Sequence, residues 1–439
     1  MEGDESAARK HPEGTGEPTV ADSTPPAGHG RRDFLRRAGL FSGFLGLGTI
    51  LQKYGTQYFL IPRAPTQADS PRSEWAGSRV QAYRTLGRTG WQMSDISFGT
   101  AHTRDANVVR AALDRGITYI DTSPDYSDAE SERVVGQAIA GRRDKVFVAS
   151  KFCTTDGHLP TDASVATIIE AVEGSLKRLG TDYLDLCHIH ACDEIERLMA
   201  TNFHEAFDRL KEQGKVRFMG VSSHTPNLEA VMNRAVDSGR FDVIMVAYNF
   251  ENWPDLTNII DKAHANNVGF VAMKTLKGAY HTALADFTPD ERNSFTQAAF
   301  KWVHGNPKVS GLVVSISHTE QLDEYLFASG KALAPSDLSL LQKYDKAIAR
   351  HYCRPGCGQC LGSCPAGLPI DDVLRYSMYF DSYRSERLAM VKYDRLPAER
   401  KASICASCSA PCEKACPFDV PIREKMTRAH ALLSLPGRA

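Results

Sequence analysis

One repeated pattern restricts the fold of this chain more than any other feature: short apolar stretches alternate with helical ones and end on polar residues. The first clear example, residues 117–130, reads as a buried strand followed by a tight loop. Two more strands start at Lys145 and at Tyr183. If these strands are parallel, their carboxyl ends meet on one rim, where loops converge and chemistry takes place. The pattern therefore gathers four proton-carrying side chains at one place: Asp121, Tyr126, Lys151 and His190.

The alternation of strands and helices continues from Tyr83 over about 250 residues, which is the size of a TIM (β/α)8 barrel. A glycine-containing hairpin within 85–94 is expected to close the barrel floor. We therefore predict an α/β fold with a barrel over residues 83–333. Further strands are expected at 96–100, 218–222, 243–247, 269–273 and 311–315, and helices at 107–115, 130–140, 164–179 and 202–213.

Length and composition indicate an ordinary globular protein with more than one folded unit. The chain has 439 residues, 42% hydrophobic and 24% charged, with a net charge of -1. There is no basic excess of the kind that binds nucleic acid, so we expect no nucleic-acid partner. The 11 cysteines are unevenly distributed, because eight follow residue 350. That clustering favours a metal module over a disulfide framework.

The N-terminal region has the features of an export signal. Residues 1–30 are rich in Gly, Pro, Glu and Thr, which predicts disorder. In the segment 31–51, Arg31 and Arg32 precede an apolar stretch and resemble a twin-arginine signal. That stretch is about 14 residues and is interrupted by glycines, so it is too short to span a bilayer comfortably. A basic surface helix and an ordinary secretory signal are the alternatives, and cleavage stays open. Residues 52–82 read as a polar linker.

Four segments in order resemble the aldo-keto reductase family, over residues 83–330. They are YRTLGRTGWQMSDISFGT from Tyr83, DTSPDY from Asp121, GKVRFMGVSS from Gly214 and TEQLDEYL from Thr319. The resemblance implies an NAD(P)-dependent oxidoreductase acting on a small carbonyl or alcohol. It also implies that the four rim residues above form the family's catalytic tetrad.

The resemblance implies a role for each tetrad residue. Tyr126 would donate a proton to the developing alkoxide, and Lys151 would lower the pKa of this phenol. Asp121 would hold the ammonium, and His190 would orient the carbonyl oxygen. Taken singly, each residue has a structural explanation, such as capping a helix, packing in a loop or solvation at the rim. Their occurrence together at strand ends favours catalysis.

The resemblance also implies contacts with NAD or NADP. Ser222 matches a family position that contacts the nicotinamide carboxamide, whereas Ser223 and Met245 differ from the residues of many members. Basic residues that would neutralise a 2'-phosphate are replaced, which leaves the NADP preference open. The segment 274–292 is either a substrate loop or a solvated connection. The predicted cofactor contacts are Ser222, Ser223 (in place of Asn), Met245 (in place of Gln), Ser315 and Gln321 (in place of basic residues), and Glu324.

Two cysteine runs, each ending in Cys-Pro, resemble the bacterial ferredoxin pattern for a pair of 4Fe-4S clusters. Zinc is an alternative, since paired cysteine runs also build thiolate sites, and disulfides are a third. Helices expected at 371–393 and 423–435 predict a small α-helical ferredoxin-like domain over 334–439. By the ferredoxin pattern, one cluster takes Cys353, Cys357, Cys360 and Cys416, and the other takes Cys405, Cys408, Cys412 and Cys364.

The export signal and the clusters explain each other. Clusters are assembled inside the cell, so a loaded protein needs the twin-arginine machinery, which moves folded cargo to the periplasm or to a tether on the outer side of the inner membrane. Nicotinamide moves two electrons together and each cluster moves one, yet no flavin fingerprint is present. Either a redox partner protein mediates, or barrel and clusters act apart, or the clusters are structural. The alternative to an exported enzyme is a redox-carrier or binding subunit with a non-catalytic barrel.

Overall fold

The computed structural model describes residues 72–127, 129–224, 227–251, 255–276, 294–354, 357–381 and 386–434. The N-terminus 1–30, the twin-arginine signal 31–51 and most of the predicted substrate loop lie outside these residues. None of the helices in the described segments combines the length and the apolar character needed to cross a membrane.

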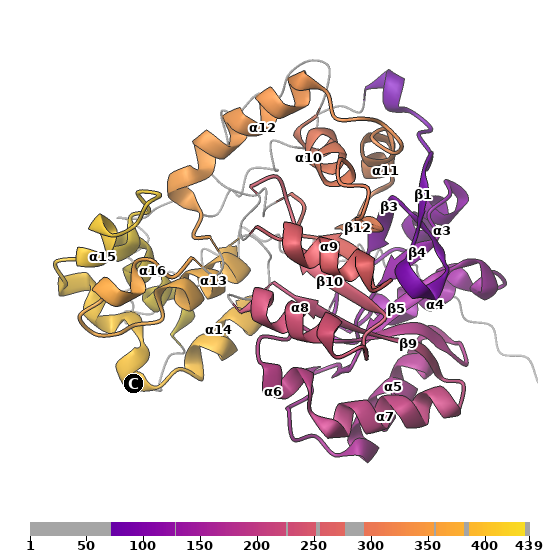
Figure 1. The fold of residues 1–439 in the computed structure, drawn as a ribbon, viewed down its shortest axis with the longest axis horizontal. Helices are drawn as coiled ribbons and strands as arrows, with labels where there is room; N and C mark the ends of the chain where they lie inside the picture. The colour runs from indigo at the N-terminus through magenta and orange to yellow at the C-terminus, as the bar shows by residue number, and fades with distance from the viewer. Residues whose placement is uncertain are drawn as a thin grey trace, which may run out of the picture. The chain divides into compact units, whose positions relative to one another are not determined.

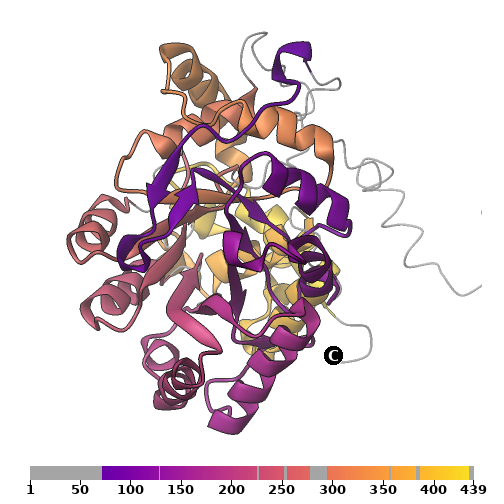
Figure 2. The ribbon, with the colours of Figure 1, turned by 90° about the vertical axis from the view of Figure 1, so that its right-hand side faces the viewer.

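The predicted barrel is confirmed. Eight parallel strands close on themselves in the order β10-β11-β12-β3-β4-β5-β8-β9 (Figure 2). Each strand is joined to the next along the chain through at least one helix, as the crossover between parallel strands requires. The strands are β3 Ile96–Gly99, β4 Tyr119–Asp121, β5 Phe147–Lys151, β8 Leu184–Ile189, β9 Val216–Ser223, β10 Val243–Ala247, β11 Gly269–Met273 and β12 Gly311–Ser315.

Helices surround the barrel strands, and α12 packs on α10 outside that ring (Figure 1). Helix α5 shows the local signals: the Ser164 hydroxyl accepts from the Thr167 N–H at 3.1 Å, and Gly180 ends the helix at φ +63°. The helices are α3 Ala106–Asp114, α4 Ser131–Ile139, α5 Val165–Leu179, α6 Ile195–Leu198, α7 Thr201–Glu212, α8 Leu228–Asp237, α9 Thr257–Ala265, α10 Phe295–His304, α11 Thr319–Leu326 and α12 Pro335–Ile348.

The expected hairpin closes the floor of the barrel. Strands β1 Tyr83–Thr85 and β2 Gln92–Ser94 pair antiparallel, and the short helix η4 Gly87–Thr89 lies between them. Leu86 and Met93 from this hairpin are fully buried with side chains of the barrel interior, among them Tyr119. The interior is therefore packed at its lower end, and the opposite end is the rim where the strands terminate.

Two boundaries differ from the prediction because packing, not composition, sets them. The expected linker 52–82 is folded from Arg72 onward, where η3 Ser73–Trp75 buries Trp75. Helix α12 lies within the predicted C-terminal domain 334–439 but packs on α10 of the barrel. The ring of Tyr344 on α12 stacks on Phe295 of α10, with centroids 3.8 Å apart. An ion pair of 2.7 Å between Lys301 and Asp337 joins the same two helices.

The C-terminal region is helical, as predicted, and has its own hydrophobic cluster, to which buried residues such as Val373, Tyr393 and Met426 contribute. Arg428 of its last helix makes two hydrogen bonds to Asp381, at 2.5 and 2.7 Å. The predicted helix 371–393 is divided in two. The elements are α13 Ile370–Asp381, α14 Glu386–Asp394, α15 Pro411–Lys414 and α16 Ile422–Leu433, with short helices η7 Ala349–His351, η8 Leu361–Ser363, η9 Ala398–Arg400 and η10 Ala402–Ser407.

Candidate active site

Three neighbouring strands deliver the predicted catalytic residues to the same rim. Strand β4 ends on Asp121 and β5 ends on Lys151, while His190 directly follows β8. These strands are adjacent in the order β4-β5-β8, so their ends lie side by side. Tyr126 lies in the turn after β4, where its N–H donates to the Ser123 carbonyl at 3.2 Å.

A buried ion pair joins two of the four residues. The Lys151 ammonium contacts the Asp121 carboxylate and also donates to the Thr122 carbonyl at 2.9 Å. Both side chains are buried. Burial raises the pKa of Asp121, and the neighbouring ammonium opposes that rise. The pair fixes one positive charge beside the turn that carries Tyr126.

The other two residues meet at their polar atoms. The Tyr126 hydroxyl lies 3.4 Å from Nε2 of His190, and the two rings meet edge to face with centroids 5.8 Å apart. The Lys151 ammonium lies 5.7 Å from the centroid of the Tyr126 ring. The structure therefore brings all four predicted residues together, and their chemical roles remain a prediction.

The electrostatics at Tyr126 differ from the expectation. We expected Lys151 to lower the pKa of the phenol. Instead, loss of water around the half-buried side chain raises the pKa of Tyr126 well above 10, and the carboxylates of Asp121 and Asp125 add to the rise. The phenol is therefore held in its protonated form at neutral pH, which is the form that donates a proton.

The imidazole of His190 is held neutral. Burial lowers the pKa of His190 well below 6.5, and His158 and Lys151 lower it further. A neutral imidazole carries one N–H, and the partner of the other nitrogen selects which one.

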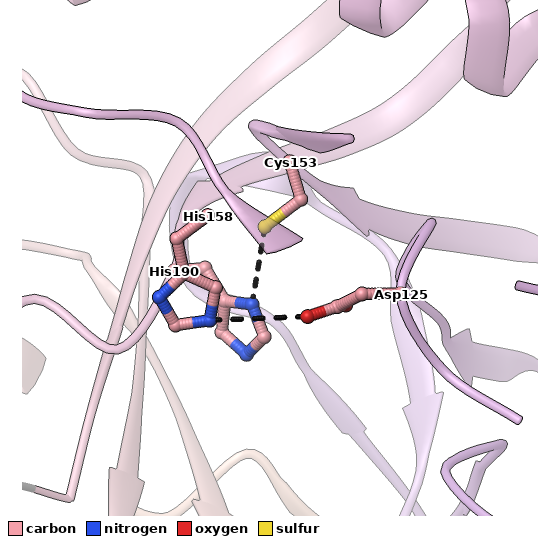
Figure 3. Close-up of side chains that lie close together, drawn as sticks. All are labelled: Asp125, Cys153, His158 and His190. Atoms are coloured by element: carbon pink, nitrogen blue, oxygen red, sulfur yellow. Dashed lines mark hydrogen bonds and ion pairs between the residues drawn. The ribbon is translucent and has the colours of Figure 1, made fainter. Parts of the chain in front are cut away.

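Sequence reasoning missed three residues that surround His190. The thiol of Cys153 lies 3.3 Å from Nδ1 of His190, the His158 ring lies 4.3 Å away between centroids, and Asp125 faces His158 (Figure 3). Burial raises the pKa of the Cys153 thiol well above 9. A protonated thiol can donate to Nδ1, which leaves the proton of His190 on Nε2, toward Tyr126. The only sequence signal was the position of Cys153 two residues after Lys151.

The C-terminal region also reaches the rim. The hydroxyl of Tyr379 on α13 lies 2.9 Å from Nδ1 of His224, which follows β9. The Lys274 ammonium lies 5.5 Å from the centroid of the Tyr379 ring. Burial lowers the pKa of Lys274 to about 7, and the guanidinium of Arg375 contributes. No local pattern in the sequence predicts these long-range contacts.

Comparison with known proteins assigns the barrel. The family model described as the aldo/keto reductase family matches residues 87–293, which contain the four rim residues. Over these residues the barrel is similar to the aldo/keto reductase family. The chain is thus an aldo-keto reductase-like oxidoreductase.

Similar proteins include bacterial oxidoreductases. The uncharacterized oxidoreductase YqkF of Bacillus subtilis is 28% identical over 301 residues, which cover 60% of this chain and 96% of YqkF. The L-glyceraldehyde 3-phosphate reductase of Escherichia coli is 25% identical over 292 residues, which cover 61% of this chain and 82% of that enzyme. The crystal structure of an aldo-keto reductase from Klebsiella pneumoniae in complex with NADPH matches with a TM-score of 0.50 and 26% identity, over 60% of this chain and 95% of that one.

In this reductase barrel, the predicted cofactor residues occupy two parts of the rim. Ser222 and Ser223 end β9, and Met245 on β10 is paired in register with Ser222. The Ser222 hydroxyl accepts from the Ala191 N–H at 3.0 Å and so also positions the loop after His190. Met245 is buried in the barrel interior.

The second part is the segment after β12. Ser315 ends that strand, and Gln321 caps the start of α11, because its Oε1 accepts from the Ser317 N–H at 2.7 Å. Glu324 is buried against the first residues of α10, among them Thr296. The side chains of Gln321 and Glu324 are thus held by internal contacts, and their role toward a dinucleotide remains a prediction.

Proposed function

We propose that this protein is an exported iron-sulfur oxidoreductase whose barrel interconverts a small carbonyl compound and its alcohol. One observation carries the proposal: the Tyr126 hydroxyl lies 3.4 Å from Nε2 of His190, beside the ion pair of Lys151 and Asp121. This arrangement places a protonated phenol and a neutral imidazole where the oxygen of one carbonyl group can contact both.

The residues divide the work in the direction of reduction. A nicotinamide dinucleotide, when bound, supplies the hydride. Tyr126 donates its proton to the carbonyl oxygen, and Nε2–H of His190 orients the same oxygen. The nearby ammonium of Lys151 stabilises the phenolate that forms, and Asp121 holds that ammonium in position.

Similarity supports the cofactor and the substrate class. The Klebsiella pneumoniae reductase binds NADPH, and the Escherichia coli relative is named for a small aldehyde. Ser222 and Ser223 lie at the end of β9, next to β8 and the catalytic histidine that follows it, where they suit a nicotinamide carboxamide. Either NAD or NADP fits this proposal, since Ser315 and Gln321 provide no charge for a 2'-phosphate.

The tail suits iron-sulfur clusters. One apolar pocket is lined by all four thiols of one predicted set and by side chains such as Ile404 and Met426. In the other set, Cys360 lies close enough to the thiols of Cys416 and Cys357 for their charges to interact with it. Dry, thiolate-lined sites of this kind tune and protect Fe–S clusters, which would supply one-electron transfer. The pocket is lined by Cys364, Cys405, Cys408 and Cys412.

Ligand spacing favours clusters over single zinc ions in the tail. Among the described residues, the one group of Cys, His, Asp or Glu whose ligand atoms all lie within 4.8 Å of one another is at the barrel rim, not in the tail. Four thiols around a single zinc ion lie close together, whereas a four-iron cube holds its thiols further apart.

A redox carrier with a non-catalytic barrel is the second candidate. It is favoured by Met245, which is buried in the barrel interior where many family members place a Gln contact. Export through the twin-arginine route is part of both proposals. Cell fractionation tests it: replacing Arg31 and Arg32 by Lys should retain the protein in the cytoplasm, and unchanged export would reject this route.

Tyr126→Phe tests the enzymatic proposal in anaerobically purified full-length protein. Loss of the proton donor should lower carbonyl reduction by about 100-fold or more, while the affinity for NADPH or NADH stays unchanged. Tyr83→Phe is the control, because that hydroxyl donates to the Gly116 carbonyl at the barrel floor. Full activity of Tyr126→Phe would rule out this donor. Iron-loaded wild-type protein that binds neither dinucleotide would favour the carrier.

A further inference from the structure

We propose that Asp125, Cys153, His158 and His190 form a binding site for one tetrahedral divalent metal ion, with Zn²⁺ the ion that suits these ligands best. Figure 3 shows the four side chains pointing toward one another at the barrel rim. Their ligand atoms all lie within 4.8 Å of one another. The set combines one sulfur, two imidazoles and one carboxylate, the donors that zinc prefers.

Three separate segments supply the ligands, and one of them, the β6–β7 hairpin, supplies both Cys153 and His158. Asp125 lies in the turn after β4, and His190 follows β8. Cys153 and His158 face each other across a small hairpin formed by β6 Cys153–Thr154 and β7 Gly157–His158. Cross-strand partners in such a pair lie on the same face with their side chains adjacent. The hairpin therefore preorganises half of the site.

The distances are close to those that a metal ion requires. Zinc bonds of about 2.0–2.3 Å put tetrahedral ligand atoms about 3.5 Å apart. Cys153 Sγ lies 3.3 Å from His190 Nδ1, and His158 Nε2 lies 4.0 Å from Asp125 Oδ2. Only small side-chain movements are needed to close all four ligands around one ion.

Supporting contacts and charge also fit a cation. The Ser123 hydroxyl donates to Asp125 Oδ1 at 2.5 Å, which leaves Oδ2 facing His158. Such an outer contact orients a ligating carboxylate. On binding, the Cys153 proton leaves to solvent, so a thiolate and a carboxylate balance the two charges of the ion. Asp125 and His158 are partly exposed, with 22% and 23% of their side chains accessible, which gives an ion a path to the site.

The site has a direct consequence for His190. Coordination through Nδ1, the nitrogen next to Cys153, requires the imidazole proton to be on Nε2. Nε2 is the nitrogen 3.4 Å from the Tyr126 hydroxyl. A bound ion would thus take over the tautomer selection that the Cys153 thiol can perform alone. Metal binding itself does not depend on the barrel being catalytic.

Metal affinity in paired variants tests the site. Iron-loaded, full-length protein is titrated with Zn²⁺ against a chromophoric chelator, and X-ray absorption at the zinc edge reports the ligands. Cys153→Ala should lower the affinity for one equivalent of zinc by about 100-fold or more, since even outer contacts are worth 10–100-fold. Cys192→Ala is the matched control, because this buried barrel cysteine is outside the group and its thiol faces the Glu194 carbonyl.

A second pair keeps the test decisive if Cys153→Ala does not fold. His158→Ala, on the rim hairpin, should show the same loss, whereas His204→Ala on α7 should bind zinc like the wild type. Equal zinc affinity in wild type, Cys153→Ala and His158→Ala would overturn the proposal, as would an absorption spectrum without one sulfur ligand. Tyr126→Phe separates the two proposals, because it should abolish turnover and leave zinc affinity unchanged.

Discussion

At the scale of single residues, Glu324 shows how position in the fold can change the properties of a side chain. The sequence predicts that this residue contacts a cofactor, but the structure buries its carboxyl group against the start of α10. Burial raises the pKa of Glu324 to about 7, although hydrogen bonds with Ser294 and Thr296 oppose the rise. The carboxyl group of Glu324 therefore gains or loses its proton near neutral pH in the folded protein.

Glu324→Gln should change the pH dependence of stability. The folded pKa of about 7 exceeds the unfolded value of 4.5, so protonation of Glu324 stabilises the fold fully below pH 4.5 and this contribution is lost as pH rises through 7. Gln resembles the protonated form, so the variant should be more stable than the wild type by about 2 kcal/mol above pH 7 and similar to it near pH 4.5. Denaturant unfolding across pH measures this. Glu320→Gln, on the exposed side of α11, is the control, and equal pH profiles of wild type and Glu324→Gln would contradict the prediction.

The rim residues show what single-residue reasoning can and cannot find. Asp121, Lys151 and His190 were predictable because each ends or follows an apolar strand, and parallel strands bring their ends together. The contact between Cys153 and His158 was not predictable from the sequence. It depends on the register of the short hairpin β6–β7, whose residues show no apolar alternation. The pKa of Tyr126 was also beyond the sequence, because it depends on the orientation of nearby carboxylates.

At the scale of elements, the floor hairpin closes the barrel through a very close approach of two backbones. Gly87 has φ +48°, and a Cβ atom built there would lie 2.2 Å from the Gly269 nitrogen at the start of β11. The backbone of the same turn also bonds across the gap, since the Arg88 N–H donates to the Asn267 carbonyl at 2.7 Å. Only glycine allows this contact at position 87.

Gly87→Ala should therefore destabilise the barrel far more than Gly90→Ala. Gly90 also has a left-handed backbone, at φ +72°, but a Cβ atom there would meet nothing within 4 Å. We expect Gly90→Ala to cost about 1 kcal/mol from backbone strain alone, and Gly87→Ala to cost about 3 kcal/mol or more because the backbones must separate. Thermal unfolding of the two variants measures the difference, and equal midpoints would show that the close approach is unimportant.

Strands with strong local patterns were predicted at their observed bounds, and elements held by distant contacts were not. Val243–Ala247, Gly269–Met273 and Gly311–Ser315 are short apolar runs with polar or turn residues on either side. By contrast, Trp75 is buried in a segment whose composition reads as a polar linker. Helix α12 follows the barrel in sequence, but only its contacts with α10 show that it packs there.

At the scale of the whole folded unit, contacts between described residues attach the cysteine-rich region to the barrel rim. Arg354 makes an ion pair of 2.9 Å with Glu251 beyond β10, and Tyr379 bonds to His224 beyond β9. Arg354 also lies over the Phe418 ring, 3.9 Å from its centroid. The contacts of Arg354 with Glu251 and of Tyr379 with His224 join segments more than 100 residues apart, which is why sequence reasoning predicted both parts and not their connection.

Iron content tests the proposed clusters in the intact protein. Cys405→Ser removes one ligand from one predicted set only, so it should lower iron and sulfide by roughly half after anaerobic purification. Cys192→Ser, in the barrel, should leave both unchanged. Zinc in place of iron in the wild-type protein, or equal iron in wild type and Cys405→Ser, would reject the ferredoxin pattern for this set.

The ion pair between Arg354 and Glu251 limits how such experiments can be interpreted. Arg354 directly follows Cys353, so any event that rearranges that thiol also moves the guanidinium that pairs with Glu251 beyond β10. Protein without iron is then expected to turn over slowly because the Arg354–Glu251 ion pair is displaced, whether or not electrons normally reach the barrel. Electron transfer between the barrel and the cysteine-rich region is therefore tested in protein whose clusters are reduced while the Arg354–Glu251 ion pair stays in place.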